Sequence, residues 1–320
     1  MSQPARRASW QLRLASESVR RFVRRERWGD EVALVRRARA SFGAPAPVAM
    51  LAAVGLDIRA VAEGGIRGEW ITPRNPRPGV ILYIHGGGFV SCSSRTHRPL
   101  TTWLARHTRR RVFSVDYRLA PEARFPAAFD DVVAAYRWLL ESGAAPSSSI
   151  AIAGDSAGGG LALSLLVAIR ESNLPRPCCG YLASPWLDLT ASGASVRTNA
   201  GRCAMFAPGN MKEFADVYLG EAAAADERAS PLFSDLSELP PILIQVGDSE
   251  LLFDDAARLH EKLCAARVES VLETSPHVFH GWQMLVGLVP ESGEALRRCS
   301  AFITSHMDAR PRNARSLAPD

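Results

Sequence analysis

The sequence predicts an α/β fold, in which helices cover both faces of a mostly parallel central sheet. Three observations predict it. From residue 56 on, short β-rich runs alternate with helical patterns, as they do in chains of βαβ units. The clearest runs are almost continuously apolar, which is typical of strands buried on both faces. The chain has 320 residues, 47% of them hydrophobic, which is enough for one large core with accessory helices.

The expected elements follow one another in a regular order. The clearest strands span residues 80–84, 112–115, 150–153, 180–183 and 242–246. Residues 57–72, interrupted by Gly64 and Gly65, predict an antiparallel hairpin at the start of the sheet, and 268–273 is the expected last strand. Helical patterns fill residues 97–108, 128–141, 157–171, 254–266 and 291–306.

Three segments fit no βαβ unit. Residues 10–40 predict one or two amphipathic helices that Gly29 interrupts. The expected apolar side of these helices consists of Trp10, Leu14, Phe22, Val32 and Val35. Residues 186–230 are best explained as an insertion on top of the sheet. The tail from Asp308 is expected to be disordered.

Residues 1–40 are strongly basic. They hold eleven arginines and four acidic residues, a local charge of +7, so the rest of the chain carries −2 of the total of +5. Such a segment is able to bind nucleic acid or anionic lipid. Arginine is nevertheless the general cation of this protein, because Lys212 and Lys262 are its only lysines. We therefore expect the solvated face of a packed helix, and no nucleic-acid partner.

Cysteine usage and hydropathy predict a cytoplasmic protein. The six cysteines form no CxxC pair and no cysteine–histidine spacing typical of a metal site, so we expect reduced, structural thiols and no metal. The amino terminus lacks the apolar stretch of a signal peptide, and no window is long and apolar enough to span a bilayer. No stable membrane insertion is expected.

Residues 150–159, IAIAGDSAGG, are the most informative stretch of the chain. Strand, sharp turn and helix follow one another, with Ser156 at the apex, as in a nucleophile elbow. Gly154 and Gly158 stand where such a turn brings the backbone together. The amide of Ala157, at the start of the helix, is expected to point toward a developing oxyanion. The alternative is an ordinary strand–loop–helix turn.

Residues 85–89, HGGGF, directly follow the strand at 80–84. Three successive glycines allow backbone amides to point inward. We expect Gly87, Gly88 and Ala157 to form an oxyanion hole, in which each donor contributes about 3–4 kcal/mol. A phosphate-binding loop is excluded, because the chain has no GxxxxGK[ST] and no GxGxxG after its first strand. His85 is expected to hold the shape of the loop.

Three motifs together resemble those of the bacterial hormone-sensitive-lipase-like esterases, often called family IV. They are HGGGF at 85–89, DYRLAPE at 116–122 followed by FPA at 125–127, and GDSAGG at 154–159, in the family's order. The resemblance covers roughly residues 55–305 and implies an α/β-hydrolase fold, a helical cap and esterase activity without a cofactor. It divides the chain into an amino-terminal cap segment (1–45), a catalytic domain (46–307, with a cap insertion at about 186–230) and a tail (308–320).

The catalytic base is expected after the last strand, since triad order in this fold is serine, acid, histidine. That order excludes the histidines that precede Ser156, namely His85, His97 and His107. His260 lies in a helical pattern and His306 near the tail, so His277 and His280 remain. In the family that the sequence resembles, the catalytic histidine precedes a glycine and an aromatic residue, which favours His280 before Gly281 and Trp282.

The acid is expected just past the strand at 242–246. The candidates are Asp248, Glu250, Asp254 and Asp255. Most of the resembled family has Asp-Pro-Leu here, whereas this sequence has Glu-Leu-Leu at 250–252. The slot aligns to Glu250, and some members of the family use glutamate. Asp248 and Asp254 are the alternatives, although Asp254 begins a helix and fits a helix-terminal role.

The predicted reaction is the hydrolysis of short- to medium-chain acyl esters through an acyl-enzyme on Ser156. An amidase or peptidase with the same triad, or a non-catalytic ligand-binding homologue, is the alternative. The candidate substrate-pocket residues are Phe89, Asp155, Trp186, Met205, Phe206 and Trp282. Many relatives pair through their last edge strand, so the resemblance also predicts a homodimer through 268–273.

Overall fold

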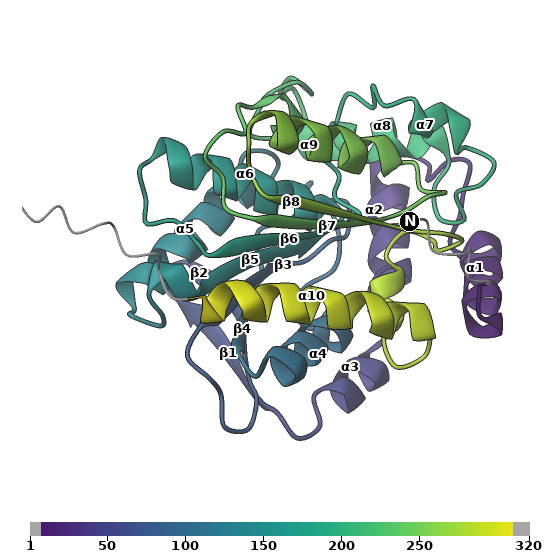
Figure 1. Ribbon diagram of the computed structural model, residues 1–320. Coiled ribbons are helices and arrows are strands. Elements are labelled where there is room, and N and C mark those ends of the chain that lie inside the picture. The colour runs from purple at the N-terminus through teal and green to yellow at the C-terminus, as the bar shows by residue number, and fades with distance from the viewer. Residues whose placement is uncertain (1–7, 310–320) are drawn as a thin grey trace, which may run out of the picture.

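The computed structural model describes residues 8–309, and an eight-stranded sheet forms its centre (Figure 1). The strand order is β1-β2-β4-β3-β5-β6-β7-β8. The prediction of a mostly parallel sheet is confirmed: β2 runs antiparallel to β1 and β4, and every other neighbouring pair is parallel. The strands are β1 (Asp57–Glu63), β2 (Ile66–Thr72), β3 (Val80–Ile84), β4 (Arg111–Val115), β5 (Ile150–Asp155), β6 (Cys179–Ala183), β7 (Ile242–Gly247) and β8 (Ser270–Ser275).

Helices cover both faces of the sheet, which explains why its central strands are apolar at every position. In β3, Leu82 faces one core and Tyr83 faces the other, and both are fully buried. The first core is closed by α5 (Ala127–Glu141), α6 (Ala157–Glu171) and α9 (Phe253–Ala265). The second is closed by α4 (Arg98–Thr108) and α10 (Pro290–Asp308), on the opposite side of the sheet in Figure 1.

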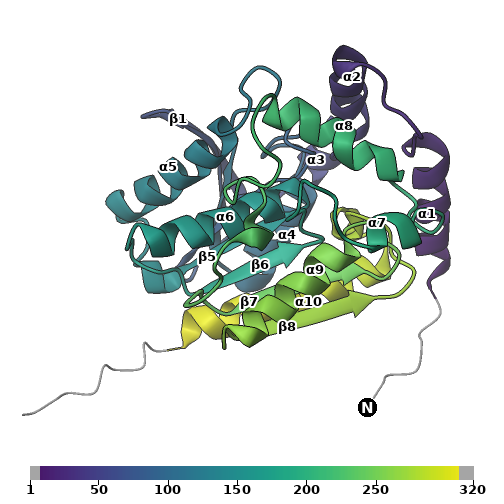
Figure 2. The same cartoon turned by 90° about the horizontal axis from the view of Figure 1, so that it is seen from above.

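The carboxyl ends of the parallel strands lie along one side of the sheet, and this side positions the site described below. The loops after β3, β5, β6, β7 and β8 all begin there, where α/β sheets generally bind their ligands. Figures 1 and 2 show α1 (Trp10–Phe22) and α2 (Glu31–Ser41) beyond these strand ends.

The insertion between β6 and β7 contains α7 (Ser195–Thr198) and α8 (Pro208–Leu219). Aromatic rings join it to the amino-terminal segment: Phe214 of α8 lies 5.3 Å from Trp28 and 6.0 Å from Phe42, measured between ring centroids. Arg124, before α5, forms an ion pair with Glu31 of α2. The remaining elements are α3 (Ala46–Ala52) and the 3₁₀ turns η1 (Ser147–Ser149), η2 (Pro231–Phe233) and η3 (Trp282–Leu285).

The apolar side expected for residues 10–40 is wrong in four of its five residues. Val35 is buried, but Trp10, Leu14, Phe22 and Val32 are exposed. Helix α1 instead packs through Leu12, which is fully buried, with Ala15 and Val19 beside it. Apolar residues occur on two sides of α1, and periodicity alone does not decide which side meets the core.

Two boundaries differ from the predicted ones. The last strand begins at Ser270, two residues later than expected, because Val268 still donates its N–H to Leu263 at the end of α9. Helix α10 continues to Asp308, whose carboxylate pairs with Arg77 and Arg110. Most of the tail predicted to be disordered, residues 310–320, lies outside the described residues, as do residues 1–7. None of the helices within 8–309 has the length and apolarity needed to cross a bilayer.

Candidate active site

The turn between β5 and α6 holds Ser156 in a backbone conformation that non-glycine residues rarely adopt, with φ 53° and ψ −124°. Such a conformation costs about 1–3 kcal/mol and lasts only where the surroundings enforce it. Two glycines do so here. A Cβ atom at Gly154 would lie 2.3 Å from the carbonyl oxygen of Gly158, and one at Gly158 would lie 2.2 Å from that of Ile84. The turn therefore has no room for a side chain at either position.

The structure brings Ser156, His280 and Glu250 into one chain of hydrogen bonds. His280 Nε2 lies 2.8 Å from Ser156 Oγ, and His280 Nδ1 lies 2.7 Å from Glu250 Oε2. Glu250 is 1% exposed and His280 5%. An ionised carboxylate only accepts hydrogen bonds, so Nδ1 carries the proton and Nε2 is left to accept the one from the serine hydroxyl.

The other candidate acids lie apart from His280 and have partners of their own. Asp248 forms an ion pair with Arg202 at 3.1 Å and accepts the N–H of His277. Asp254 accepts the N–H of Ser195 at 2.9 Å. Asp255, on α9, accepts the N–H groups of residues 187 and 188.

Three backbone amides, two in the glycine loop and one at the start of α6, have no protein acceptor within residues 8–309. Within the described residues, the N–H groups of Gly87, Gly88 and Ala157 donate to no protein group. Gly87 and Gly88 have φ values of 117° and 63°, so both need a residue without a Cβ. His85 shapes this loop: its Nδ1 lies 2.7 Å from the Gly86 carbonyl, and its ring stacks on Tyr117. Burial, aided by the nearby His97, lowers the pKa of His85 to about 4.

Comparison with known proteins agrees with this geometry. The model of the alpha/beta hydrolase fold family matches residues 81–284. An acetyl-hydrolase of Streptomyces hygroscopicus is 38% identical over 76% of this chain and 81% of its own length. An esterase of Acinetobacter venetianus is 38% identical over 78% of this chain and 82% of its own. A solved esterase from the bacterial hormone-sensitive lipase family is 37% identical, with a TM-score of 0.83 over 96% of this chain and 100% of that one.

The chain belongs to the hormone-sensitive-lipase-like esterases of the α/β-hydrolase fold. It is a carboxylic ester hydrolase that resembles carboxylesterases, and enzymes of this family act through a serine acyl-enzyme. The fold, the family and the reaction class predicted from the sequence are therefore confirmed.

In this esterase, residues that the sequence reasoning missed hold Glu250 in place. Ser184 Oγ donates to Glu250 Oε1 at 2.7 Å, and the N–H of Gly247 donates to the same oxygen at 2.6 Å. Asn199, from the insertion, donates to the carbonyl of Glu250 at 2.8 Å. A signal was available for Ser184, because it directly follows the strand beside β7, whereas nothing in the sequence singles out Asn199.

Asp155, a candidate pocket residue, instead forms hydrogen bonds that hold the glycine loop. Its carboxylate accepts the Tyr83 hydroxyl at 2.6 Å and the Gly86 N–H at 3.0 Å, and its Oδ2 lies 3.3 Å from His97 Nε2. Burial alone would raise the pKa of Asp155, but His97 and Tyr83 outweigh burial and the pKa is lowered. The buried carboxylate thus joins the nucleophile turn to the start of the glycine loop.

The other five candidate pocket residues have different surroundings, and one of them contacts His280. Phe206 is next to His280, with ring centroids 5.3 Å apart. Met205 is half-buried against the first core. Phe89 stacks on Tyr218 of α8 at 3.8 Å, and Trp186 lies 5.7 Å from Phe89. Trp282 is fully buried in the apolar cluster that joins α1, α10 and residues 278–279.

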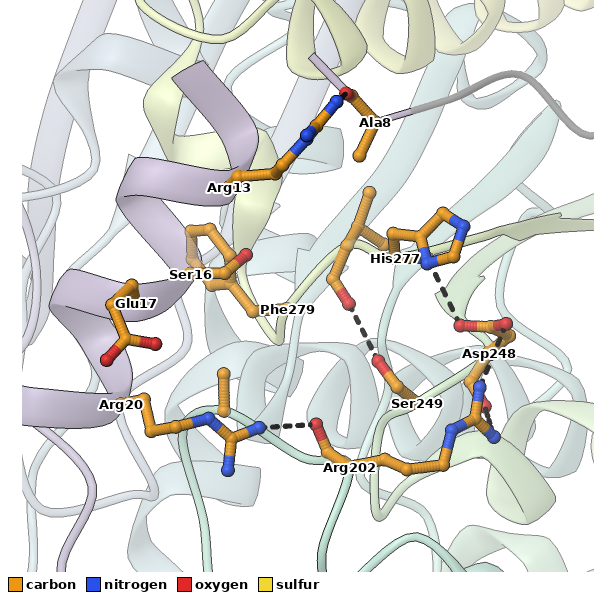
Figure 3. A pocket seen from close by; sticks show the side chains of 12 residues that line it. Ala8, Arg13, Ser16, Glu17, Arg20, Arg202, Asp248, Ser249, His277 and Phe279 are labelled. Carbon is orange, nitrogen blue, oxygen red and sulfur yellow. Dashed lines mark hydrogen bonds and ion pairs between the residues drawn. The ribbon is translucent and has the colours of Figure 1, made fainter. Parts of the chain in front are cut away.

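A pocket of about 700 Å³ lies between α1 and the loops that hold Glu250 and His280 (Figure 3). Its walls include Arg13 and Arg20 of α1 on one side, and Arg202 with residues 248–249 and 277–279 on the other. Ser156 and the glycine loop are not among its lining residues. The described residues contain no group of three histidine, cysteine or acidic side chains placed to hold a metal ion.

Proposed function

We propose that Ser156, His280 and Glu250 are the nucleophile, the base and the orienting acid of ester hydrolysis. The observation that supports this most is the hydrogen-bond chain of 2.8 Å and 2.7 Å through the two nitrogens of His280. Ser156 Oγ attacks the ester carbonyl carbon as its proton passes to His280 Nε2. The bond to the alcohol oxygen then breaks, and His280 returns the proton to the departing alcohol. Water cleaves the acyl-enzyme by the same route.

We further propose that Gly87, Gly88 and Ala157 donate to the oxyanion. Their three amides lack an acceptor within the described residues, and Ala157 is the first residue of α6, where the helix dipole favours negative charge. The N–H of Gly86 already donates to Asp155 and is not part of this set.

The substrate we infer is an ester with a short acyl group. A Cβ at Gly88 would lie 2.6 Å from the ring of Phe214, so this ring closes the space beside the glycine loop. Phe206 closes the space beside His280, and the relative from Streptomyces is an acetyl-hydrolase. Because Phe206 and Phe214 come from the insertion, we propose that it acts with the amino-terminal segment as a cap. Phe214→Ala should shift the preferred ester toward longer acyl chains, and an unchanged preference would contradict the cap.

Ser156→Ala tests the central assignment. Ester turnover should fall about 10⁴-fold or more, and a sulfonyl fluoride should label the parent protein on Ser156 but not the variant. A well-folded Ser156→Ala protein that still hydrolyses esters would overturn the proposal. Parallel assays of an ester and its matched amide separate an esterase from an amidase, and we expect the ester to be cleaved far faster.

Two further proposals concern the environment of the protein. We propose a homodimer through β8, the strand at the edge of the sheet, whose outer backbone groups a second copy could pair. A monomeric mass by light scattering at micromolar concentration would contradict it. All six cysteines are free, which fits a reducing cytoplasm. Cell fractionation with antibody detection tests that location.

A further inference from the structure

One side of α1 exposes three large apolar side chains. Trp10, Leu14 and Phe22 are 69%, 61% and 69% exposed. Their spacing of four and eight residues aligns them along one side of a helix. We call them the outer strip of α1. The opposite side, with the fully buried Leu12, packs against Val278 and Phe279 of the loop before His280, so the outer strip is not needed to hold α1 in place.

The charge around this strip is positive, and no ion pair among the described residues neutralises it. Arg13, Arg20 and Arg21 belong to α1, whose one acidic residue is Glu17. Within residues 8–309, no carboxylate lies at ion-pair distance from these arginines; Arg13 donates to the Ala8 carbonyl, and Arg20 to carbonyls of the insertion. Arg13 and Arg21 are exposed.

The strip also lies where a flat surface could reach it. Figures 1 and 2 show α1 at the rim of the molecule. Its first turn is tied to α10, because Ser9 donates through both its N–H and its hydroxyl to Glu291. Leu288, three residues before Glu291, is 67% exposed, so exposed apolar surface continues beside the start of the helix.

We propose that the outer strip of α1 docks this esterase on an anionic lipid surface. Tryptophan, phenylalanine and leucine enter the boundary between headgroups and acyl chains, and flanking arginines bind lipid phosphates. The uncompensated arginines favour an anionic surface over a second copy of the chain, because two such helices facing each other would repel. Docking by one helix face is peripheral and needs no helix that spans the bilayer. The proposal does not depend on the catalytic roles assigned above.

Vesicle co-sedimentation tests the proposal. We expect the protein to bind vesicles of phosphatidylcholine containing about one-third phosphatidylglycerol, and to bind pure phosphatidylcholine at least about tenfold more weakly. The triple variant Trp10→Ser/Leu14→Ser/Phe22→Ser should lose at least about tenfold in binding to the anionic vesicles. The matched control, Met50→Ser/Leu51→Ser/Val54→Ser, removes similarly exposed apolar side chains in α3 and just after it. The arginine beside them, Arg106, donates to the carbonyls of Ala52 and Val54, and the control should bind like the parent.

A charge variant separates lipid docking from pairing of the strip with a second copy of the chain. Arg21→Glu should weaken binding to anionic vesicles by more than about fivefold, and raised salt should weaken it further. All variants should give the far-UV circular dichroism spectrum and the melting curve of the parent, which shows that they are folded. Equal binding of the outer-strip variant and the α3 control would overturn the proposal. So would a change of the outer-strip variant from dimer to monomer by light scattering without any parent binding to vesicles, because a second copy would then cover the strip.

Discussion

The serine side of the site and its acid–base side are built by different means. On the serine side, the backbone does the positioning: Gly154, Gly158 and Gly87 pack so closely that a methyl group at any of them would collide with a carbonyl oxygen. On the acid–base side, hydrogen bonds to a buried side chain do it. Glu250 Oε1 receives two hydrogen bonds, from Ser184 and from the N–H of Gly247, while Oε2 contacts His280.

This difference teaches which changes each side tolerates. A site made of close-packed backbone is damaged by atoms that are added, since the neighbouring carbonyls have nowhere to go. A site made of buried hydrogen bonds is damaged by atoms that are removed, since the remaining partner stays buried and unsatisfied. The same logic explains why glycines mark the serine side, whereas the acid–base side shows no comparable pattern.

Glu250→Gln should have the largest effect on the acid–base side. The variant keeps the size of the side chain but loses the charge that stabilises the imidazolium, and its amide can present a donor to Nδ1. We expect turnover to fall about 10⁴-fold, as in the comparable change in a serine protease. Steady-state kinetics at neutral pH, with thermal melts as the folding check, measure it. Asp254→Asn is the control and should remain active; the reverse outcome would show that Asp254 is the acid.

Gly158→Ala is the corresponding change on the serine side. The new Cβ would lie 2.2 Å from the Ile84 carbonyl oxygen, so we expect a loss of about 3 kcal/mol in the free energy of unfolding, together with most of the activity. Gly201→Ala is the matched control, because nothing lies within 4 Å of its new Cβ. Denaturant titration of both variants decides the point. Equal stability of the two would mean that the turn adjusts to a side chain.

Asp255→Asn tests a buried carboxylate on the acid side that has no proposed catalytic role. Burial raises the pKa of Asp255 to about 7, above that of an unfolded chain. The contribution of Asp255 to the free energy of unfolding should therefore fall as the pH rises from about 4 to 7, and then level off. The variant removes the charge but leaves an amide N–H without an acceptor, so above pH 7 we expect a net gain of about 2 kcal/mol. Melting curves measured across this pH range test the prediction. A constant difference in stability between the two proteins at every pH would contradict it.

Ser184→Ala should have the smallest effect and sharpens the comparison most. It removes one of the two hydrogen bonds to Glu250 Oε1, so the carboxylate keeps its charge but loses part of its orientation. We expect kcat to fall about tenfold with little change in KM. Ser300→Ala is the control: its hydroxyl is buried and has no hydrogen-bond partner within the described residues. If both variants kept full activity, side-chain hydrogen bonds would not be what positions the acid.

The helices of the amino-terminal segment show where sequence reasoning went wrong. The helices themselves were predictable from the spacing of apolar residues. The interruption between them was predictable from Gly29, because glycine weakens helices. The buried side of α1 was not, because Trp10 and Leu14 are as apolar as Leu12 and their period is equally helical. Only the surface on which α1 lies, formed by Val278 and Phe279, selects Leu12.

The sequence by itself determined the features that lie within one continuous stretch of chain. The buried strands, the turn around Ser156 and the glycine loop are of this kind, because each follows from local backbone and burial requirements. Only the tertiary structure decided that Glu250, rather than Asp248 or Asp254, meets His280, and that Asp155 faces Tyr83 and His97 rather than a pocket. The physical reason is that candidate residues only a few positions apart in the sequence differ in where their side chains point. Partners that are distant in the chain decide where each side chain points.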